Sequence, residues 1–313
     1  MDRFGDLSNF VAVVEAGGIG AAADRLNLSK SVVSRRLKAL ESRLGVELVA
    51  RTTRTLRVTN EGQVFFERSR QVLADLEEAE AALIHGRTSL SGTLRVSAPV
   101  QFGQQYIAPA MNEFIARHDR LTLDLDLVDR HVGLVEEGYD LAIRIGRLPD
   151  SGLIARRLCD VEVHVCASPG YLGTHGEPEA IGDLAHHDGL LHRAGATITG
   201  WAWTDGTGTV RNAAIRSRMI SNDDRVLLAA ARDGLGIISI PDFAALPDIR
   251  AGRLRRIMAD TDWLTLGAYA VYPPTRHLSH RVRSIVDFLV AHVRASGGQP
   301  GGARAIAGDP RCR

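Results

Sequence analysis

The chain has 313 residues, of which 45% are hydrophobic and 24% charged, and its formal net charge is only +1. This composition is that of a globular protein, and the length suits one small domain beside a larger one. The sequence contains no apolar run of the roughly eighteen residues that a membrane span needs, and it begins without the basic-then-apolar pattern of a signal segment. We therefore expect a cytoplasmic protein without a membrane partner.

The three cysteines, Cys159, Cys166 and Cys312, are an odd number at no metal-like spacing. Cys159 and Cys166 lie in apolar, strand-like sequence, so buried thiols are expected rather than a disulfide or a pair of metal ligands. No metal and no cofactor are expected.

The first 29 residues contain two short helical patterns. Apolar residues recur at helical spacing up to the stop signal Gly17-Gly18, at Phe4, Leu7, Phe10, Val11 and Val14. A second helix is predicted over 21–26, and the turn Asn27-Leu28-Ser29 follows it. A short helix, a tight turn and a further helix make a helix-turn-helix, whose second helix enters the major groove of DNA.

The helix predicted after this turn has two contrasting faces. Ser29 can cap its N-terminus. Its apolar stripe lies within roughly 60° of arc and consists of Val33, Leu37, Leu40 and Leu44. The opposite side offers hydroxyl and cationic groups, from Ser31, Ser34, Arg35 and Lys38. Such groups donate to guanine O6 and N7 or to phosphate oxygens.

Basic residues are concentrated in this part of the chain. Residues 19–58 carry nine Lys and Arg against three Asp and Glu, a net charge of +6 in a chain whose total is +1. A local positive field of this kind is typical of a surface that binds a polyanion.

Residues 4–66 resemble the winged helix-turn-helix of the LysR-type transcriptional regulators, and the similarity continues to about residue 292. The residues that carry it are Ala21-Ala-Ala-x-x-Leu26, Ser29-x-Ser-x-Val-Ser-Arg35, Leu40-Glu41-x-x-Leu44-Gly45-Val46-x-Leu48, Arg51-Thr-Thr-Arg54 and Thr59-x-x-Gly62. Three residues depart from the family pattern. Gly20 replaces a hydroxyl residue that usually opens the second helix, Lys30 stands where Gln is most frequent, and Val49 stands where the wing often has Phe.

The resemblance assigns roles to the basic region. Base edges are expected to be contacted by Lys30, Ser31, Ser34 and Arg35. Phosphates or the minor groove are expected to be contacted by Lys38, Arg51, Thr53 and Arg54. The change to Lys30 either shifts a base preference from adenine toward guanine or adds a phosphate contact, and the second interpretation is favoured.

A long helix is predicted from Asn60 to Gly86. A narrow apolar seam fits a heptad, at Phe65, Val72, Leu76, Ala79 and Leu83. The alternative is a helix lying on its own domain, but the narrow seam and the charges on the other faces favour helix-to-helix dimerisation. The resemblance implies the same pairing, and residues 87–92 then form a hinge-like loop.

From Thr93 onward strands and helices alternate, which predicts a parallel α/β sheet. Strands are expected over 94–98, 121–128, 140–145, 162–167, 236–240 and 269–272, and helices over 102–117, 132–138, 221–233 and 279–293. The resemblance implies a two-lobed, periplasmic-binding-protein-like effector domain, with crossing strands near 163–167 and 266–271. The tail from Ser296 is rich in Gly, Pro, Ala and Arg and is expected to be disordered.

A ligand is expected beyond the carboxyl ends of the strands, near helix N-termini. The candidate residues are Ser97, Val100, Gln101, Phe102, Arg144, His192 and Asn222. Two helix N-termini facing one cleft, supplemented by Arg144 or His192, favour a small carboxylate. An aromatic carboxylate is suggested by Phe102 together with Trp201 or Trp203. Ser97 and Asn222 could instead only cap helices, and His192 could be a structural histidine.

Other functions fit less well. His186-His187 and His192 lack a third metal ligand, and no nucleophile elbow or phosphate loop is present, so an enzyme is not expected. A solute-binding protein is a remote alternative, against which the attached basic domain argues. Ligand-independent DNA binding, as a constitutive repressor or an architectural protein, is a further alternative, and it would predict a cleft filled by the protein's own side chains.

The sequence thus predicts a transcriptional regulator that binds specific double-stranded DNA and is gated by a small, anionic effector. The expected division is a winged domain over 1–59, a linker helix and hinge over 60–92, an effector domain over 93–295 and a tail over 296–313. Lobe I comprises 93–163 and 268–295, and lobe II comprises 164–267. The expected partners are a second copy or three further copies of the chain, and RNA polymerase if the protein activates transcription.

Overall fold

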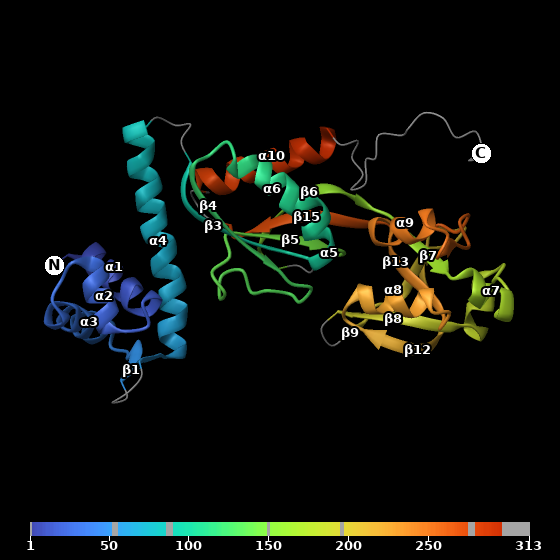
Figure 1. The fold of residues 1–313 in the computed structure, drawn as a ribbon, viewed down its shortest axis with the longest axis horizontal. Helices are drawn as coiled ribbons and strands as arrows, with labels where there is room; N and C mark the ends of the chain where they lie inside the picture. The colour runs from blue at the N-terminus through green and yellow to red at the C-terminus, as the bar shows by residue number, and fades with distance from the viewer. Residues whose placement is uncertain are drawn as a thin grey trace.

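The computed structural model describes residues 2–51, 56–85, 90–148, 151–194, 197–274 and 279–295. A small helical domain lies at one end, one long helix stands beside it, and two α/β lobes follow (Figure 1). None of the helices in these residues is long and apolar enough to cross a membrane.

The N-terminal domain consists of α1 (Arg3–Glu15), α2 (Ile19–Leu26), α3 (Lys30–Leu44) and an antiparallel hairpin of β1 (Val49–Arg51) and β2 (Leu56–Val58). Its core is formed by apolar residues of all three helices and of the hairpin, among them Phe10, Val33, Leu37 and Leu48. Asn9 on α1 donates from Nδ2 to the Val33 carbonyl at 3.1 Å, which fixes α3 against α1. The predicted helix-turn-helix and its wing are confirmed.

The long helix α4 (Asn60–His85) begins directly after the wing. Phe65 and Phe66 pack against Phe10, with ring centroids 5.6 and 6.4 Å apart, and Leu73 joins the same core. Phe65 is thus half-buried against its own domain, which agrees with the alternative of a helix lying on its own domain, and the dimer seam stays a prediction. Val72 of the seam is 46% exposed. The side chains of Ala79 and Leu83 lie outside the described residues.

Lobe I is built on a five-stranded sheet of order β4-β3-β5-β15-β6. Its strands are β3 (Ser91–Ala98), β4 (Arg120–Leu127), β5 (Leu141–Ile145), β6 (Ile154–Val161) and β15 (Leu266–Tyr272). The helices α6 (Ala108–Ile115) and α10 (His280–Ala295) pack together against it (Figure 1). The short α5 (Val100–Phe102) and a π-helical turn (Gly103–Ile107) join β3 to α6.

Lobe II has a sheet of order β12-β8-β13-β7-β14, to which β9 is paired through β8. The strands are β7 (Val163–Ala167), β8 (Asp188–Ala194), β9 (Thr197–Ile198), β12 (Arg216–Ser221), β13 (Ile237–Pro241) and β14 (Arg255–Arg256). Helices α7 (Pro169–His175), α8 (Asp224–Arg232) and α9 (Asp242–Arg250), a 3-10 helix (Ile181–His186) and a hairpin of β10 (Trp201–Thr204) and β11 (Val210–Ala213) complete the lobe.

Three details of the predicted effector domain need correction. The sheets are mixed rather than parallel, because β15 and β7, which follow the two crossings between lobes, run antiparallel to their neighbours. Residues 132–138 form one turn instead of a helix, ended by Gly138 at a φ of +69°. The helix expected from Ser221 begins at Asp224, and Asp223 caps it. The tail 296–313, with Cys312, lies outside the described residues.

Cys159 and Cys166 are buried free thiols, as predicted. Burial raises the pKa of Cys159 to about 11 and that of Cys166 to about 12. Both thiols therefore stay protonated and unreactive at neutral pH.

Candidate DNA-binding face and effector site

The recognition helix α3 has the cap and the two faces that the sequence predicts. Ser29 Oγ accepts from the Val32 N–H at 3.4 Å and lies 2.9 Å from Ser31 Oγ. Gly45, at a φ of +72°, ends the helix. The apolar anchors Val33, Leu37 and Leu40 are fully buried. Three of the outward groups, Ser31, Arg35 and Lys38, are exposed, while Ser34 is half-buried.

The wing is fastened to α3 by a side chain for which the sequence analysis gave no role. Glu41 Oε1 accepts from the backbone N–H groups of Leu48 and Val49, at 3.0 and 3.1 Å. Thr59 Oγ1 donates to the Glu47 carbonyl at 2.8 Å and accepts from the Gly62 N–H at 2.9 Å. Glu41, Thr59 and Gly62 belong to the motifs quoted above, and these hydrogen bonds hold the wing against α3 and the start of α4.

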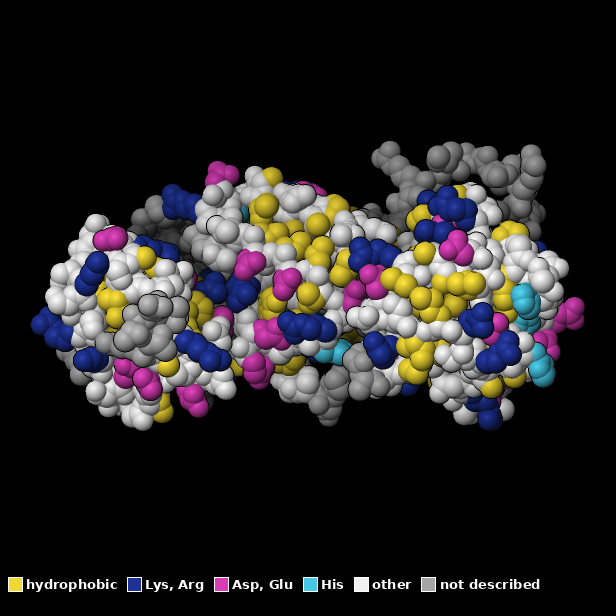
Figure 2. All heavy atoms as spheres, turned by 60° about the horizontal axis from the view of Figure 1, so that its bottom comes forward, with side chains coloured by type: hydrophobic (Ala, Val, Ile, Leu, Met, Phe, Trp, Pro, Cys, Tyr) yellow, Lys and Arg dark blue, Asp and Glu magenta, His cyan; other side chains and the backbone are white. Residues whose placement is uncertain are grey.

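The wing residues expected to bind DNA are only partly described. Arg51 ends β1, and its backbone pairs with Leu56. Its side chain, and the whole of Thr53 and Arg54, lie outside the described residues. Lys and Arg side chains are spread over the winged end of the surface (Figure 2).

Gly20 and Lys30, two of the residues that depart from the family pattern, lie close together in the helix-turn-helix. A Cβ at Gly20 would lie 3.4 Å from Lys30 Cε and 3.7 Å from its Nζ. The Lys30 side chain therefore lies over the first turn of α2, and a side chain at position 20 would compete for its space. The residue that caps α2 is Gly18, which has no side chain to offer.

In lobe I, the predicted effector residues surround the turn after β3. Ser97 is buried, and the Val100 N–H donates to Asp129 Oδ1 at 2.9 Å. Gln101 Oε1 is buried and has no hydrogen-bond partner among the described residues. Phe102 is buried between the lobes, with its ring 5.4 Å from that of Phe243 in lobe II.

Arg144 lies within β5 rather than after it. Its Nη2 donates to the Val132 carbonyl at 2.7 Å, and partial burial lowers its pKa. The guanidinium stays charged, since its ordinary pKa is far above neutral pH. Arg144 is thus a half-buried cation held in place by lobe I.

In lobe II, His192 Nδ1 lies 2.8 Å from Asp224 Oδ1 at the start of α8. The hydrogen bond to Asp224 raises the pKa of His192, and the charge of Asp129, on lobe I, adds to this shift. Asp129 belongs to lobe I and His192 to lobe II, and their charges interact. Asn222, which is exposed, immediately precedes the cap Asp223.

Sequence reasoning missed the acidic residues of this region. Asp129 occupies the N–H of Val100, and Asp223 caps α8 and pairs with Arg225. The protein's own carboxylates thus occupy both helix starts that were expected to attract an anion. Both residues come shortly after a strand, and this position in the sequence is the feature by which they could have been predicted.

The aromatic residues of lobe II have structural surroundings. Trp201 is buried in the core of lobe II, and Trp203 packs at the same core and bridges to Trp263. His187 is buried, and its Nδ1 lies 3.2 Å from the Tyr171 hydroxyl. Across the described chain, no group of three His, Cys, Asp or Glu could hold a metal ion.

Comparison with known proteins gives the same assignment for both parts of the chain. The family model of the bacterial regulatory helix-turn-helix protein, lysR family, matches residues 4–63, and that of the LysR substrate binding domain matches residues 87–294. An uncharacterized HTH-type transcriptional regulator of Haemophilus influenzae is 36% identical over 91% of this chain and 99% of its own. The regulator CrgA of Neisseria meningitidis (serogroup C) is 35% identical over 91% and 95%.

Solved structures are similar over nearly the whole length. The structure of CrgA from Neisseria meningitidis, a LysR-type transcriptional regulator, covers 92% of this chain and 98% of its own, with a TM-score of 0.57 and 34% identity. The full-length structure of the Vibrio cholerae virulence activator AphB covers 92% and 99%, with a TM-score of 0.55 and 27% identity.

The His192–Asp224 pair makes a pH-dependent contribution to stability. Because the pKa of His192 is raised in the fold, its contribution is complete below the ordinary pKa of about 6.5 and is lost as the pH rises through the raised value. We expect His192→Gln to reduce the free energy of unfolding more at about pH 5.5 than at about pH 8.5. Urea denaturation at both pH values measures this difference, and an equal loss at both would contradict the pairing.

Proposed function

Because the chain belongs to the LysR-type transcriptional regulators, we propose that α3 reads specific DNA sequences and that a small organic acid between the lobes controls this binding. The family makes the chain a DNA-binding transcriptional regulator with an effector-binding domain, and not an enzyme. The observation that supports base reading most directly is the outer face of α3. It presents exposed hydroxyl and cationic groups from a helix whose opposite face is fully buried.

Each outward side chain has a role that follows from its position. Ser31 and Arg35 lie one turn apart on the exposed face and would contact base edges, with Ser34 between them. Lys30 lies over the start of α2, where the first helix of the motif crosses the DNA backbone, and would contact a phosphate. Lys38 and the wing residues Arg51, Thr53 and Arg54 would hold the flanking backbone.

The effector is proposed to be a small organic acid that also carries a hydrogen-bond donor. Arg144 and His192 supply cationic groups for a carboxylate. Asp129, on lobe I, would accept from a hydroxyl or ammonium group of the ligand in addition to the Val100 N–H. Ser97, Val100, Gln101 and Asn222 would line the site, and the unpartnered Gln101 Oε1 supplies a further acceptor. Phe102 would form the apolar base of the effector site between the lobes.

We propose self-association through α4. Val64 and Val72 are 51% and 46% exposed on this helix, whereas Phe66 is buried and Phe65 half-buried against the winged domain. Two copies paired in this way would present two recognition helices to a DNA site with two-fold symmetry. RNA polymerase would be a further partner if the protein activates transcription.

Ligand-independent binding is a second candidate, and one observation favours it. Phe102 and Tyr106 of lobe I contact Phe243 of lobe II, so that an aromatic cluster of the protein's own side chains occupies part of the space between the lobes. Such filling is what ligand-free operation predicts, and a ligand screen separates the two candidates.

A thermal-shift screen against hydroxy acids, amino acids and simple carboxylates tests the effector proposal. A ligand at a hundred times its dissociation constant should add about 2.7 kcal/mol to the free energy of unfolding. We expect a hit among acids with a donor group, lost in Arg144→Ala and kept in Arg147→Ala, whose side chain is exposed. No shift with any acid, while DNA binding persists, would favour the ligand-independent candidate.

Arg35→Ala tests base reading. On a duplex selected from a random pool, we expect binding weaker by about 1–3 kcal/mol and a relaxed preference at one base position. Fluorescence anisotropy on the selected and on a random duplex measures both effects. Equal weakening on the two duplexes would show that Arg35 contacts only phosphate.

Lys30→Gln tests the phosphate contact. Affinity should fall by a similar factor on all duplexes, and the dependence of log K on log salt should flatten by about one unit. Gly20→Ser should weaken the wild type by displacing the Lys30 side chain and should have little effect in Lys30→Gln. A change of sequence preference with an unaltered salt slope would assign Lys30 to a base instead.

A further inference from the structure

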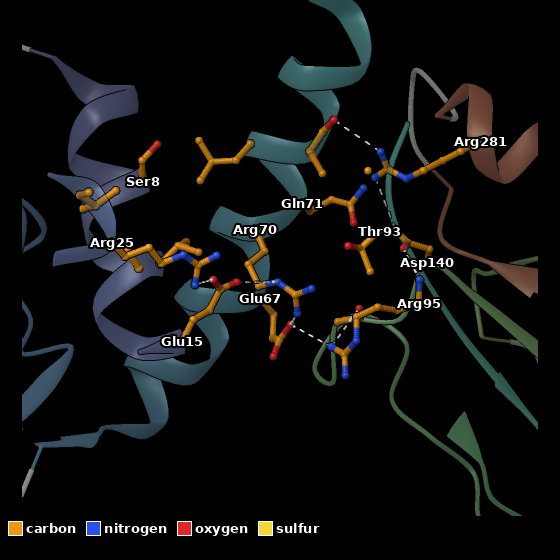
Figure 3. A pocket seen from close by; sticks show the side chains of 17 residues that line it. Ser8, Glu15, Arg25, Glu67, Arg70, Gln71, Thr93, Arg95, Asp140 and Arg281 are labelled. Carbon is orange, nitrogen blue, oxygen red and sulfur yellow. Dashed lines mark hydrogen bonds and ion pairs between the residues drawn. The ribbon is translucent and has the colours of Figure 1, made fainter. Parts of the chain in front are cut away.

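The linker helix α4 turns one polar face toward lobe I. The residues of this face recur at i, i+4, i+7 and i+8, which places them along one side of the helix, and they are Glu67, Gln71, Ala74 and Asp75. Figure 3 shows Glu67 and Gln71 opposite Arg95, Asp140 and Arg281 of lobe I. Between them lies a cavity of about 400 Å³ that is also lined by α1 and α2. We call this region the joint.

The first contact of the joint joins Glu67 to β3. Arg95 Nη1 lies 3.2 Å from Glu67 Oε2, and Glu67 is only 8% exposed. Arg70 also approaches Glu67, at 3.6 Å, and reaches Glu15 on α1 at 3.7 Å. Gly138, at a φ of +69°, allows this approach, because a Cβ there would lie 2.0 Å from Glu67 Oε2. One chain of charges thus runs from α1 through α4 to lobe I.

The second contact is centred on Arg281 of α10, whose side chain is fully buried. Its Nη1 donates to the Ala74 carbonyl of α4 at 3.4 Å, and its Nη2 lies 3.5 Å from Asp75 and 3.8 Å from Asp140. Burial raises the pKa of Asp140, and the nearby Gln71 amide opposes that shift. Arg281 is therefore sealed from solvent only while α4 rests on lobe I.

The two sides of α4 make different kinds of contact. Toward the winged domain α4 buries Phe65, Phe66 and Leu73 in a shared apolar core. Toward lobe I it offers charged and amide groups beside an open cavity, and basic side chains gather in this hollow of the surface (Figure 2). An apolar interface is lost only at a high cost in free energy, whereas separated ion pairs are rehydrated, so a polar joint opens far more readily.

The geometry points to an ionic latch at this joint. Glu67, Gln71, the Ala74 carbonyl and Asp75 on α4 engage Arg95, Asp140 and Arg281 on lobe I. The latch holds the winged domain and α4, as one body, against the effector domain, and the chain opens at this plane. This inference deepens the proposed regulation, since Arg95 and Asp140 precede or belong to strands that lead to the effector residues. Its test requires neither DNA nor an effector.

Electron paramagnetic resonance distances across the joint test the latch. Spin labels at Ser42→Cys on α3 and Asn112→Cys on α6, both exposed, report the separation of the two bodies. Cys312→Ser removes the remaining cysteine outside the described residues, and the buried Cys159 and Cys166 do not react. Diluting labelled protein with an excess of unlabelled protein restricts the signal to one protomer. The wild type should give one narrow, short distance.

Glu67→Gln, and Glu67→Gln with Asp75→Asn, remove latch charges from α4 alone and leave lobe I unchanged. Each should raise the ratio of long to short distances by about tenfold or more, because Arg95 keeps its pairing with Asp124 on lobe I but loses the carboxylate of α4, and in the double variant Arg281 also loses its ion pair with Asp75. Arg95→Gln should open the joint from the other side. Glu80→Gln, on an exposed site of the same helix, is the matched control and should change nothing. Distances in all three latch variants that equal the control, with circular dichroism unchanged, would overturn the latch.

Discussion

One long helix with two kinds of surface connects the parts of this protein. The apolar side of α4 completes the core of the winged domain, and its polar side meets lobe I through Glu67, Ala74 and Asp75. Among the residues of α4 that the structure describes, the contacts with lobe I are made by charged groups and one carbonyl, and the orientation of the recognition helix relative to the effector domain follows from them. The free energy of an ion pair between two domains is close to that of the same two charges separated and hydrated. A small change in free energy is therefore enough to shift the equilibrium between the closed and the open arrangement of the domains.

The DNA-binding face and the candidate effector site both depend on how helix faces are buried and how helix ends are capped. In α3 the fully buried Leu37 and Leu40 fix the helix, and this leaves the opposite face free for DNA. Between the lobes, Asp129 and Asp223 satisfy backbone N–H groups at the starts of α5 and α8. A ligand that enters must replace or complement these carboxylates, which is why an acid with an additional donor group fits better than a plain anion.

The local features of the fold could be predicted from the sequence because they depend on near neighbours. The cap Ser29, the helix end at Gly45 and the stripe of α3 are all set within one helix. The periodicity of α4 did not show that Phe65 packs on its own domain, because a helical repeat does not reveal which partner an apolar residue contacts. The helix predicted over 132–138 does not form, because Gly138 has a φ in the left-handed region and ends the segment after one turn. The Glu67–Arg95 and Arg281–Asp75 contacts join residues 28 and more than two hundred positions apart, and no local pattern marks them.

The central claim is that α3 reads sequence, and selection from a pool of random duplexes by the purified full-length protein tests it most directly. The account predicts enrichment of one site with two-fold symmetry, made of two half-sites separated by about one or more helical turns. Enrichment should disappear in Arg35→Ala at one base position of each half-site and persist elsewhere. Binding that enriches no sequence after repeated rounds would show that the basic face holds DNA only through its phosphates.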